Sequence, residues 1–301
     1  MSLAGRLFCR NAAKSDYERD KNLKAPTNVT AIVNVDYVGN KDPYNMLDVY
    51  YPNGTSEKLP VIVSIHGGGY VYGTKEIYKY YCMFLAQQGF TVVNFNYHLA
   101  PDWKFPAPLH ETNLVLDWMC AHADKYYMDI DRVFLVGDSA GAQICSQYTA
   151  IATNPAYARY FNFQVPTDIH IRAIALNCGL YRTCIQEARE NRDWQMVGLL
   201  TDYYGKNPEA NYRNYQEMID VLGHITENYP PTFVMTSYYD FLRHNAAPMA
   251  DFLSSKGIDT TLKCYGTEET RYMEHVCHVN MNLEEAKEIN RDECCFFREY
   301  M

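Results

Sequence analysis

A serine occupies the centre of the pentapeptide GDSAG, at positions 137–141, which fits the pattern G-x-S-x-G. The apolar run VFLVG leads into it, and AGAQICSQYTAIA, with the composition of a helix, begins within it. A serine between a strand and a helix sits on a sharp turn that lifts its hydroxyl out of the sheet. The helix N-terminus behind it favours negative charge. Ser139 is therefore predicted to be a nucleophile for acyl transfer, in preference to the alternative of a chance glycine–serine turn.

A glycine-rich segment, HGGG at positions 66–69, directly follows the continuous apolar run LPVIVSI. Glycines let the backbone approach a ligand closely and aim its N–H groups at it. Acyl transfer builds up negative charge on an oxygen, which fixed backbone donors stabilise. The amides of Gly67, Gly68 and Ala140 are the predicted oxyanion donors. A phosphate-binding loop is the alternative, but it requires a Lys-Ser or Lys-Thr pair or dinucleotide spacing, which this segment lacks.

Together, the HGGG and GDSAG segments resemble the α/β-hydrolase superfamily and, within it, the hormone-sensitive-lipase-like esterases. The segments LDVYYP, NYHLAPDWKFPAPLHE and YYDFLRHN support the resemblance, with His98 in place of the usual arginine. The similarity runs from about Leu47 to the C-terminus and is poor over residues 183–228. It implies an esterase that acts on a small-molecule ester without a cofactor.

A nucleophilic serine needs a base, and the base needs a carboxylate to orient it. In the superfamily these residues follow the chain order Ser, Asp or Glu, His. Asp240 ends the strand-like segment PTFVMTSYYD and matches the family's aspartate. Functional loops gather at the carboxyl ends of such strands. Asp240 is therefore predicted to be the orienting carboxylate, the alternative being a helix-capping or turn aspartate.

Two histidines follow Asp240 at a suitable distance, His275 and His278, in the segment RYMEHVCHVNM. In the resembling family the base lies in a turn just after the last strand. His275 fits that position better and is the predicted base, while His278 stays the alternative. A metal site that includes Glu274 and Cys277 is a third hypothesis. It is disfavoured because metal sites need three or four converging ligands and no helix is expected here to place two on one face.

The elements that must position these residues alternate along the chain. Apolar, β-branched runs predict strands, and segments of helical spacing lie between them. The alternation predicts parallel βαβ units in a largely parallel sheet. The expected strands lie in the segments VTAIVNVDYVG, NMLDVYYP, LPVIVSI, TVVNFNY, VFLVG, RAIALNC, PTFVMTSYYD and TTLKCYG.

The expected fold is therefore an α/β-hydrolase fold, with a mostly parallel central sheet flanked by helices, in one domain over residues 1–301. Residues 183–228 are polar and tyrosine-rich, and they interrupt the alternation. We expect a helical cap from this insertion, and the resemblance implies that residues 1–30, where one or two short helices are expected, contribute to it.

Composition excludes some function classes. The formal net charge of −9 argues against nucleic acid as a partner, which would favour a basic face. No apolar run is long enough to span a bilayer, and the first residues lack a secretory signal. The 10 cysteines are scattered without a C-x-x-C pair. This pattern favours reduced thiols and a cytoplasmic location over a disulfide framework.

The sequence thus predicts a serine carboxylesterase that works through an acyl-enzyme, and the resemblance implies short, acetyl-like acyl esters as its substrates. One alternative is a formamide or amide hydrolase, because HGGGY also resembles a kynurenine-formamidase-type loop. Another is a non-catalytic small-molecule receptor on the same fold. The acyl-chain length and the oligomeric state, including a homo-oligomer, stay open.

Overall fold

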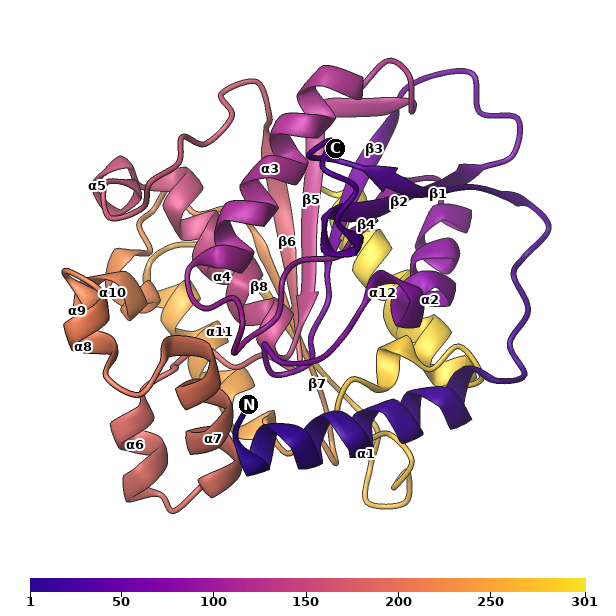
Figure 1. The fold of residues 1–301 in the computed structure, drawn as a ribbon. Coiled ribbons are helices and arrows are strands. Elements are labelled where there is room, and N and C mark those ends of the chain that lie inside the picture. The colour runs from indigo at the N-terminus through magenta and orange to yellow at the C-terminus, as the bar shows by residue number, and fades with distance from the viewer.

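The computed structural model describes residues 1–301 and is built around one eight-stranded sheet (Figure 1). The strands lie in the order β1-β2-β4-β3-β5-β6-β7-β8. The β1–β2 and β2–β4 pairs are antiparallel, and all other neighbouring pairs are parallel. The predicted mostly parallel sheet is confirmed, and every expected strand is present. The strands are β1 (Val29–Asp36), β2 (Met46–Pro52), β3 (Leu59–Ile65), β4 (Thr91–Phe95), β5 (Met128–Asp138), β6 (Ile171–Asn177), β7 (Thr232–Ser237) and β8 (Thr260–Tyr265).

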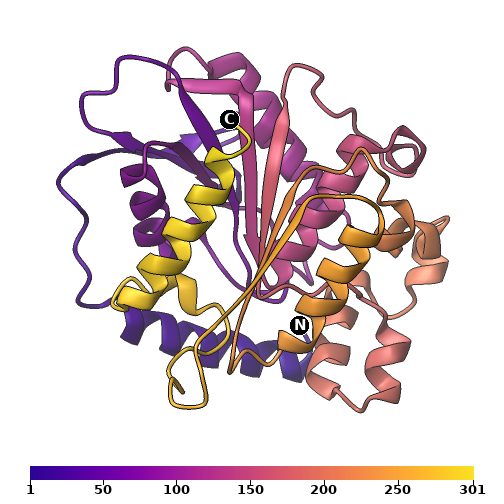
Figure 2. The ribbon, with the colours of Figure 1, turned by 180° about the vertical axis from the view of Figure 1, so that it is seen from behind.

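Helices bury both faces of the sheet, each against its own apolar cluster. One face packs against α3 (Ala107–His122), α4 (Ala140–Thr153) and α11 (Ala246–Ser255). The other packs against α2 (Lys75–Gln87) and α12 (Glu284–Arg298), which contact each other (Figure 2). Because both faces are covered, the central strands are continuous apolar runs rather than alternating ones.

Short helical segments complete the chain between these elements. Residues 183–228 contain helices and no strand, as expected. The segments are α5 (Pro155–Ala158), α6 (Ile185–Glu190), α7 (Trp194–Tyr204), α8 (Pro208–Asn211), α9 (Tyr215–Ile219), α10 (Val221–His224) and the 3-10 turns η1 (Pro43–Asn45), η2 (Arg243–Asn245) and η3 (Cys277–Val279).

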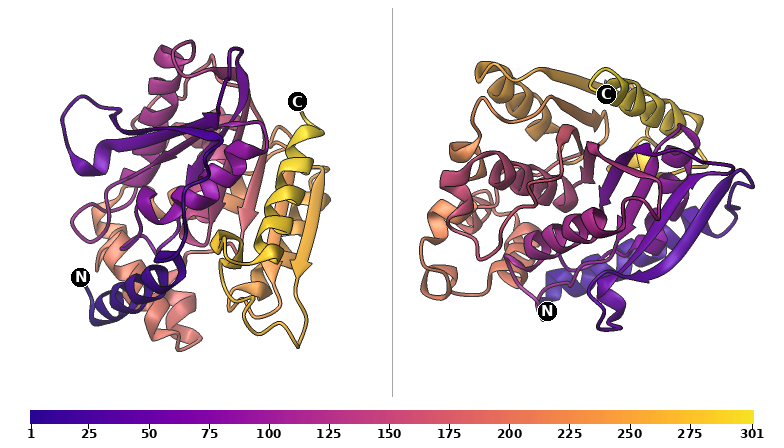
Figure 3. Two further views of the ribbon diagram at one scale, coloured as in Figure 1. Left: turned by 90° about the vertical axis from the view of Figure 1, so that its right-hand side faces the viewer. Right: turned by 90° about the horizontal axis from the view of Figure 1, so that it is seen from above.

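The N-terminal segment forms a single helix of 18 residues, α1 (Leu3–Asp20), which is longer than the one or two short helices expected there. Its sequence is polar with little periodicity, and tertiary contacts hold it in place. The backbone N–H of Ser2 donates to Asp202 of α7 at 2.8 Å, and the Tyr72 hydroxyl donates to Asp16 at 2.8 Å. α1 therefore crosses the end of the molecule opposite the C-terminus, beside α7 (Figures 1 and 3).

None of the helices, α1 included, is long and apolar enough to cross a membrane.

Candidate active site

Ser139 lies on the tight turn between β5 and α4, with φ 52° and ψ −116°. A non-glycine residue seldom adopts positive φ, so the surroundings must hold this conformation. The Ser139 N–H donates to the Asn177 carbonyl at 2.9 Å. A Cβ added at Gly141 would lie 2.1 Å from the Ile65 carbonyl oxygen, and one at Gly137 would lie 2.3 Å from that of Gly141. The two motif glycines thus let strand and helix meet closely beneath the serine.

Asp240 and His275 form a hydrogen-bonded pair on the loops after β7 and β8. Nδ1 of His275 lies 2.6 Å from Oδ1 of Asp240. The carboxylate also accepts hydrogen bonds from the Thr236 hydroxyl at 2.8 Å and the Leu242 N–H at 2.9 Å. Burial alone would raise the pKa of Asp240, but these hydrogen bonds outweigh it and hold the pKa below its usual value. An ionised Asp240 orients the imidazole and leaves Nε2 to accept a proton.

Phe241 connects this pair with the serine. Its ring centroid lies 4.2 Å from that of His275, and its side chain lines the same cavity as Ser139. No hydrogen bond joins the Ser139 hydroxyl to His275, and such bonds commonly tighten only when substrate is bound. The structure thus brings all three predicted residues to one edge of the sheet.

His278, the alternative base, points elsewhere. Its side chain is buried, and its ring centroid lies 5.3 Å from that of Tyr81, with the two ring planes nearly perpendicular. Burial lowers its pKa to about 3. It makes no hydrogen bond to Asp240, so the geometry favours His275.

The metal hypothesis is not supported by the residues on which it was based. The group that could offer three ligand atoms within 4.8 Å of one another is Cys178, Asp240 and His275, without Glu274, Cys277 or His278. Within that group Nδ1 of His275 is already bonded to Asp240. Burial also raises the pKa of the Cys178 thiol well above its usual value.

The glycine loop presents a different set of amides from the one expected. The N–H of Gly67 donates to the Tyr78 hydroxyl at 3.0 Å, and that hydroxyl donates to Asp138 at 2.8 Å. The Gly67 amide is therefore already engaged, which corrects its assignment as an oxyanion donor. The amides of Gly68, Gly69 and Ala140 donate to no group in the protein.

Gly69, which the sequence analysis did not single out, lines the cavity with Ala140. The signal that could have identified it is its place as the third glycine of HGGG. At Gly68, φ is +111° and an added Cβ would lie 2.0 Å from the Tyr72 carbonyl oxygen. Only glycine fits there, so the loop can aim its later amides toward Ser139.

Two buried carboxyl groups that the sequence analysis missed lie behind the serine turn. Glu293 of α12 accepts hydrogen bonds from the Asn177 side chain at 2.6 Å and the Tyr81 hydroxyl at 3.0 Å. Burial raises the pKa of Glu293 to about 7 and that of Asp138 to about 6. Since the Asn177 carbonyl accepts the Ser139 N–H, Glu293 supports the nucleophile through one intermediate residue.

The cavity at Ser139 has a volume of about 310 Å³ and mostly apolar walls. α1 contributes Phe8, α7 contributes Met196 and Leu199, and the loop after Asp240 contributes Phe241 and Leu242. The helices expected to form a cap therefore line the space above the nucleophile. Such a cavity suits a small uncharged part of a ligand that lies next to the Ser139 hydroxyl oxygen.

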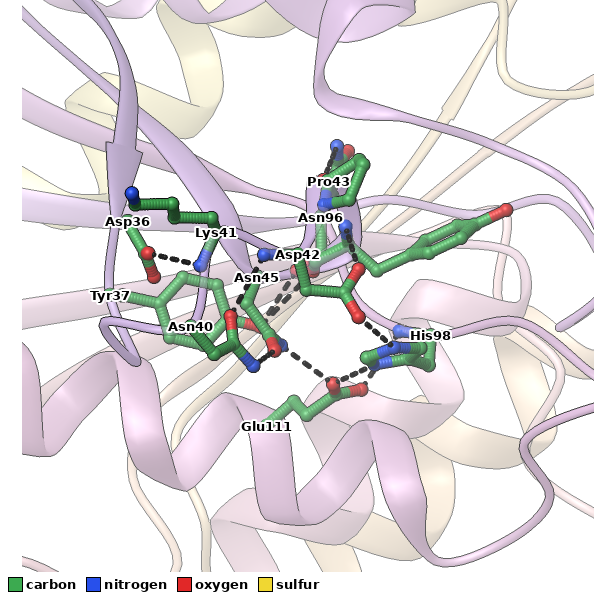
Figure 4. Close-up of polar contacts among 11 residues, drawn as sticks. Asp36, Tyr37, Asn40, Lys41, Asp42, Pro43, Asn45, Asn96, His98 and Glu111 are labelled. Carbon is green, nitrogen blue, oxygen red and sulfur yellow. Dashed lines mark hydrogen bonds and ion pairs between the residues drawn. The ribbon is translucent and has the colours of Figure 1, made fainter.

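A buried polar network supports the loop that precedes α3 (Figure 4). The His98 ring bonds to Glu111 and, at 3.3 Å, to Asp42. The same loop donates the Ala100 N–H to the Tyr70 carbonyl at 2.9 Å. The network therefore braces the glycine loop, with His98 standing where the resembling family has arginine.

Comparisons with known proteins identify relatives of this chain. A family model described as BD-FAE matches residues 47–245. A putative alpha/beta hydrolase of Acanthamoeba polyphaga mimivirus is 27% identical over 72% of this chain and 62% of its own length. The versiconal hemiacetal acetate esterase of Dothistroma septosporum is 25% identical over 70% of this chain and 66% of its own.

An acetyl esterase of Salmonella schwarzengrund is 26% identical over 64% of this chain and 58% of its own length. The chain thus spans 58–66% of the length of these curated relatives.

Solved structures show the fold. Esterase B of Lactobacillus rhamnosis superimposes with a TM-score of 0.87 at 22% identity, over 98% of this chain and 95% of that chain. The hyperthermophilic esterase of Pyrobaculum calidifontis superimposes with a TM-score of 0.74 at 22% identity, over 99% of this chain and 91% of that chain. This chain therefore has the α/β-hydrolase fold that the sequence predicted.

Proposed function

The chain belongs to the BD-FAE family and has an α/β-hydrolase fold, and from that premise we propose that it is a serine carboxylesterase that hydrolyses short-chain acyl esters. The observation that carries the proposal is the 2.6 Å hydrogen bond between His275 and Asp240. This pair lies next to Phe241, which lines the same cavity as Ser139, and Ser139 itself has a strained backbone with φ 52°. Relatives named as acetyl and hemiacetal acetate esterases support the same reaction class.

The proposed reaction begins when the Ser139 oxygen attacks the ester carbonyl carbon and His275 Nε2 takes the hydroxyl proton. Asp240 keeps the imidazole in the required tautomer and stabilises its positive charge. The carbonyl oxygen becomes negative, and the amides of Gly68, Gly69 and Ala140 donate to it. These amides are suited to the task because they have no other acceptor in the chain.

Collapse of the tetrahedral intermediate breaks the ester C–O bond. His275 returns its proton to the departing alkoxide oxygen, which leaves as the alcohol. Water then attacks the acyl-Ser139 carbonyl while His275 accepts a proton from it. The bond between the acyl carbon and the Ser139 oxygen then breaks, and His275 returns the proton to that oxygen. The carboxylic acid is released and the free serine is restored.

The size and walls of the cavity set the proposed substrate class. A volume of about 310 Å³ with walls that include Met196 and Leu199 suits a short apolar acyl group. We also propose that α1 and residues 183–228 act as the cap, because both line this cavity. The ten free cysteines support the proposed cytoplasmic location.

The test compares Ser139→Ala with the exposed-site control Ser255→Ala on 4-nitrophenyl acetate, butyrate and octanoate. Loss of at least about 10³-fold in kcat for Ser139→Ala, with the control unchanged and short chains preferred, is expected. A fluorophosphonate probe should label the wild-type protein and the control but not Ser139→Ala. Full turnover by Ser139→Ala, or faster hydrolysis of a matched formamide than of the esters, would refute the assignment.

A further inference from the structure

A second, open cavity of about 770 Å³ runs along α1 beside the catalytic cavity. Its walls include Leu3, Leu7 and Phe8 on α1, and Trp194 and Gln195 at the start of α7. No lysine, arginine, aspartate or glutamate lines it. We call this space the outer groove, and its chemistry suits an uncharged, mainly apolar ligand.

The outer groove meets the catalytic cavity at two shared residues. Phe8 and Gln195 line both spaces. Phe8 also reaches the glycine loop, because a Cβ added at Gly69 would lie 3.4 Å from its ring. The two spaces are therefore neighbours, and Phe8 and Gln195 form the wall that they share.

Large apolar side chains stand exposed along the groove. Leu3 and Trp194 are each 66% exposed and Leu7 is 42% exposed. Leu3 and Leu7 are four residues apart on α1 and so lie on one face of the helix. Clustered exposed apolar groups on a soluble domain commonly mark a binding site, and tryptophan offers a broad flat surface for aromatic or alkyl groups.

Contacts at both ends fix the helix that forms the wall of the groove. At its start, the Ser2 hydroxyl donates to Asp202 at 2.7 Å. Near its end, Arg19 donates to the Ile77 carbonyl at 2.7 Å. Because α1 is fastened at both ends, the groove is preformed and ligand binding does not have to order it.

From these observations we infer that the outer groove is a second subsite, which binds the apolar extension of an ester whose carbonyl lies at Ser139. The extension is a long alkyl or an aromatic group that projects past Phe8 and Gln195 and packs against Trp194 and Leu7. The inference rests on the proposed function, since it is the ester bond that places the ligand in both cavities.

The kinetic test uses three esters: 4-nitrophenyl acetate, which fits the inner cavity, 4-nitrophenyl decanoate, with a long acyl chain, and decyl acetate, with a long alcohol. Trp194→Ala and Leu7→Ser should lower kcat/KM about tenfold for one or both long esters, mainly through KM, and leave 4-nitrophenyl acetate unchanged. The long ester that responds tells whether the acyl or the alcohol part occupies the groove.

Leu262→Ser is the matched control, because Leu262 is 42% exposed like Leu7 but lies on the edge strand β8. It should leave all three esters unaffected. Equal losses on short and long esters in Trp194→Ala, or no loss on either long ester, would overturn the inference. So would variants that bind lipid vesicles less well yet hydrolyse both long esters normally, because the apolar residues would then serve a membrane surface.

A binding measurement separates this inference from the proposed function. 2-Dodecanone carries a carbonyl and a long alkyl chain but has no bond to hydrolyse. Calorimetry should show about tenfold weaker binding to Trp194→Ala than to the wild-type protein, and binding to Ser139→Ala should be retained. If no ester is hydrolysed but 2-dodecanone still binds more weakly to Trp194→Ala, the esterase proposal fails and the inference that the groove binds an apolar ligand is retained. If esters are hydrolysed without the difference, the groove inference fails alone.

Discussion

Replacing Glu293 by glutamine should change how the stability of the protein depends on pH. The Glu293 side chain has no exposed surface, and its hydrogen-bond partners, Asn177 and Tyr81, are both neutral. Glutamine has the same shape and no charge. Oδ1 of Asn177 has no partner, so rotation of that amide lets it accept from the introduced amide while Tyr81 still donates to the new side-chain oxygen.

The size of the pH-dependent change in unfolding free energy follows from the raised pKa of Glu293. Burial moves the pKa of Glu293 from 4.5 to about 7 in the folded protein. Between these values the folded protein binds more protons than the unfolded chain, so its stability falls as the pH rises. From pH 5 to pH 8 the wild-type protein should lose roughly 2–3 kcal/mol of unfolding free energy through this group. Glu293→Gln should not show that loss.

The assay is urea unfolding followed by circular dichroism at pH 5, 6, 7 and 8, for the wild-type protein and Glu293→Gln. Other titrating groups largely cancel in the comparison, so the difference in unfolding free energy between the two proteins should shift by roughly 2–3 kcal/mol in favour of the variant. Glu288→Gln, an exposed site on the same helix, serves as the control. A difference that stays constant from pH 5 to pH 8 would refute the reasoning.

Three further changes test the site and the cap. His275→Ala should lower kcat on 4-nitrophenyl acetate by roughly 10³-fold, while His278→Ala should keep most of it, and comparable losses in both would contradict the choice of base. Gly141→Ala places a Cβ 2.1 Å from a carbonyl oxygen, so urea unfolding should show a loss of more than about 3 kcal/mol, and near-wild-type stability would contradict the packing argument. Ser2→Ala removes the 2.7 Å hydrogen bond to Asp202 and the helix cap. The stability of α1 should fall by about 1 kcal/mol, so trypsin should cleave the helix faster. An unchanged cleavage rate would contradict the role given to the contact between Ser2 and Asp202.

Much of the fold could be predicted because its signals are local. A strand covered on both faces is apolar along its whole length. A run such as Leu59–Ile65 shows this pattern in its own sequence, so it can be recognised without knowing which segments pack against it. The turn at Ser139 is equally local, since the glycines that permit it stand two residues to either side. The N-terminal helix was harder to predict because its stability comes from distant partners, among them Asp202 and Tyr72.

The sequence by itself determined the order of the elements, the nucleophile candidate, and the two histidines from which a base could come. Only the tertiary structure shows which of those histidines bonds to Asp240, because that hydrogen bond depends on where two separate loops meet. It also decided which glycine amides stay free, since Gly67 is engaged by Tyr78 from α2. Local motifs specify which residue types are present, whereas the direction of each donor depends on packing between segments far apart in the chain.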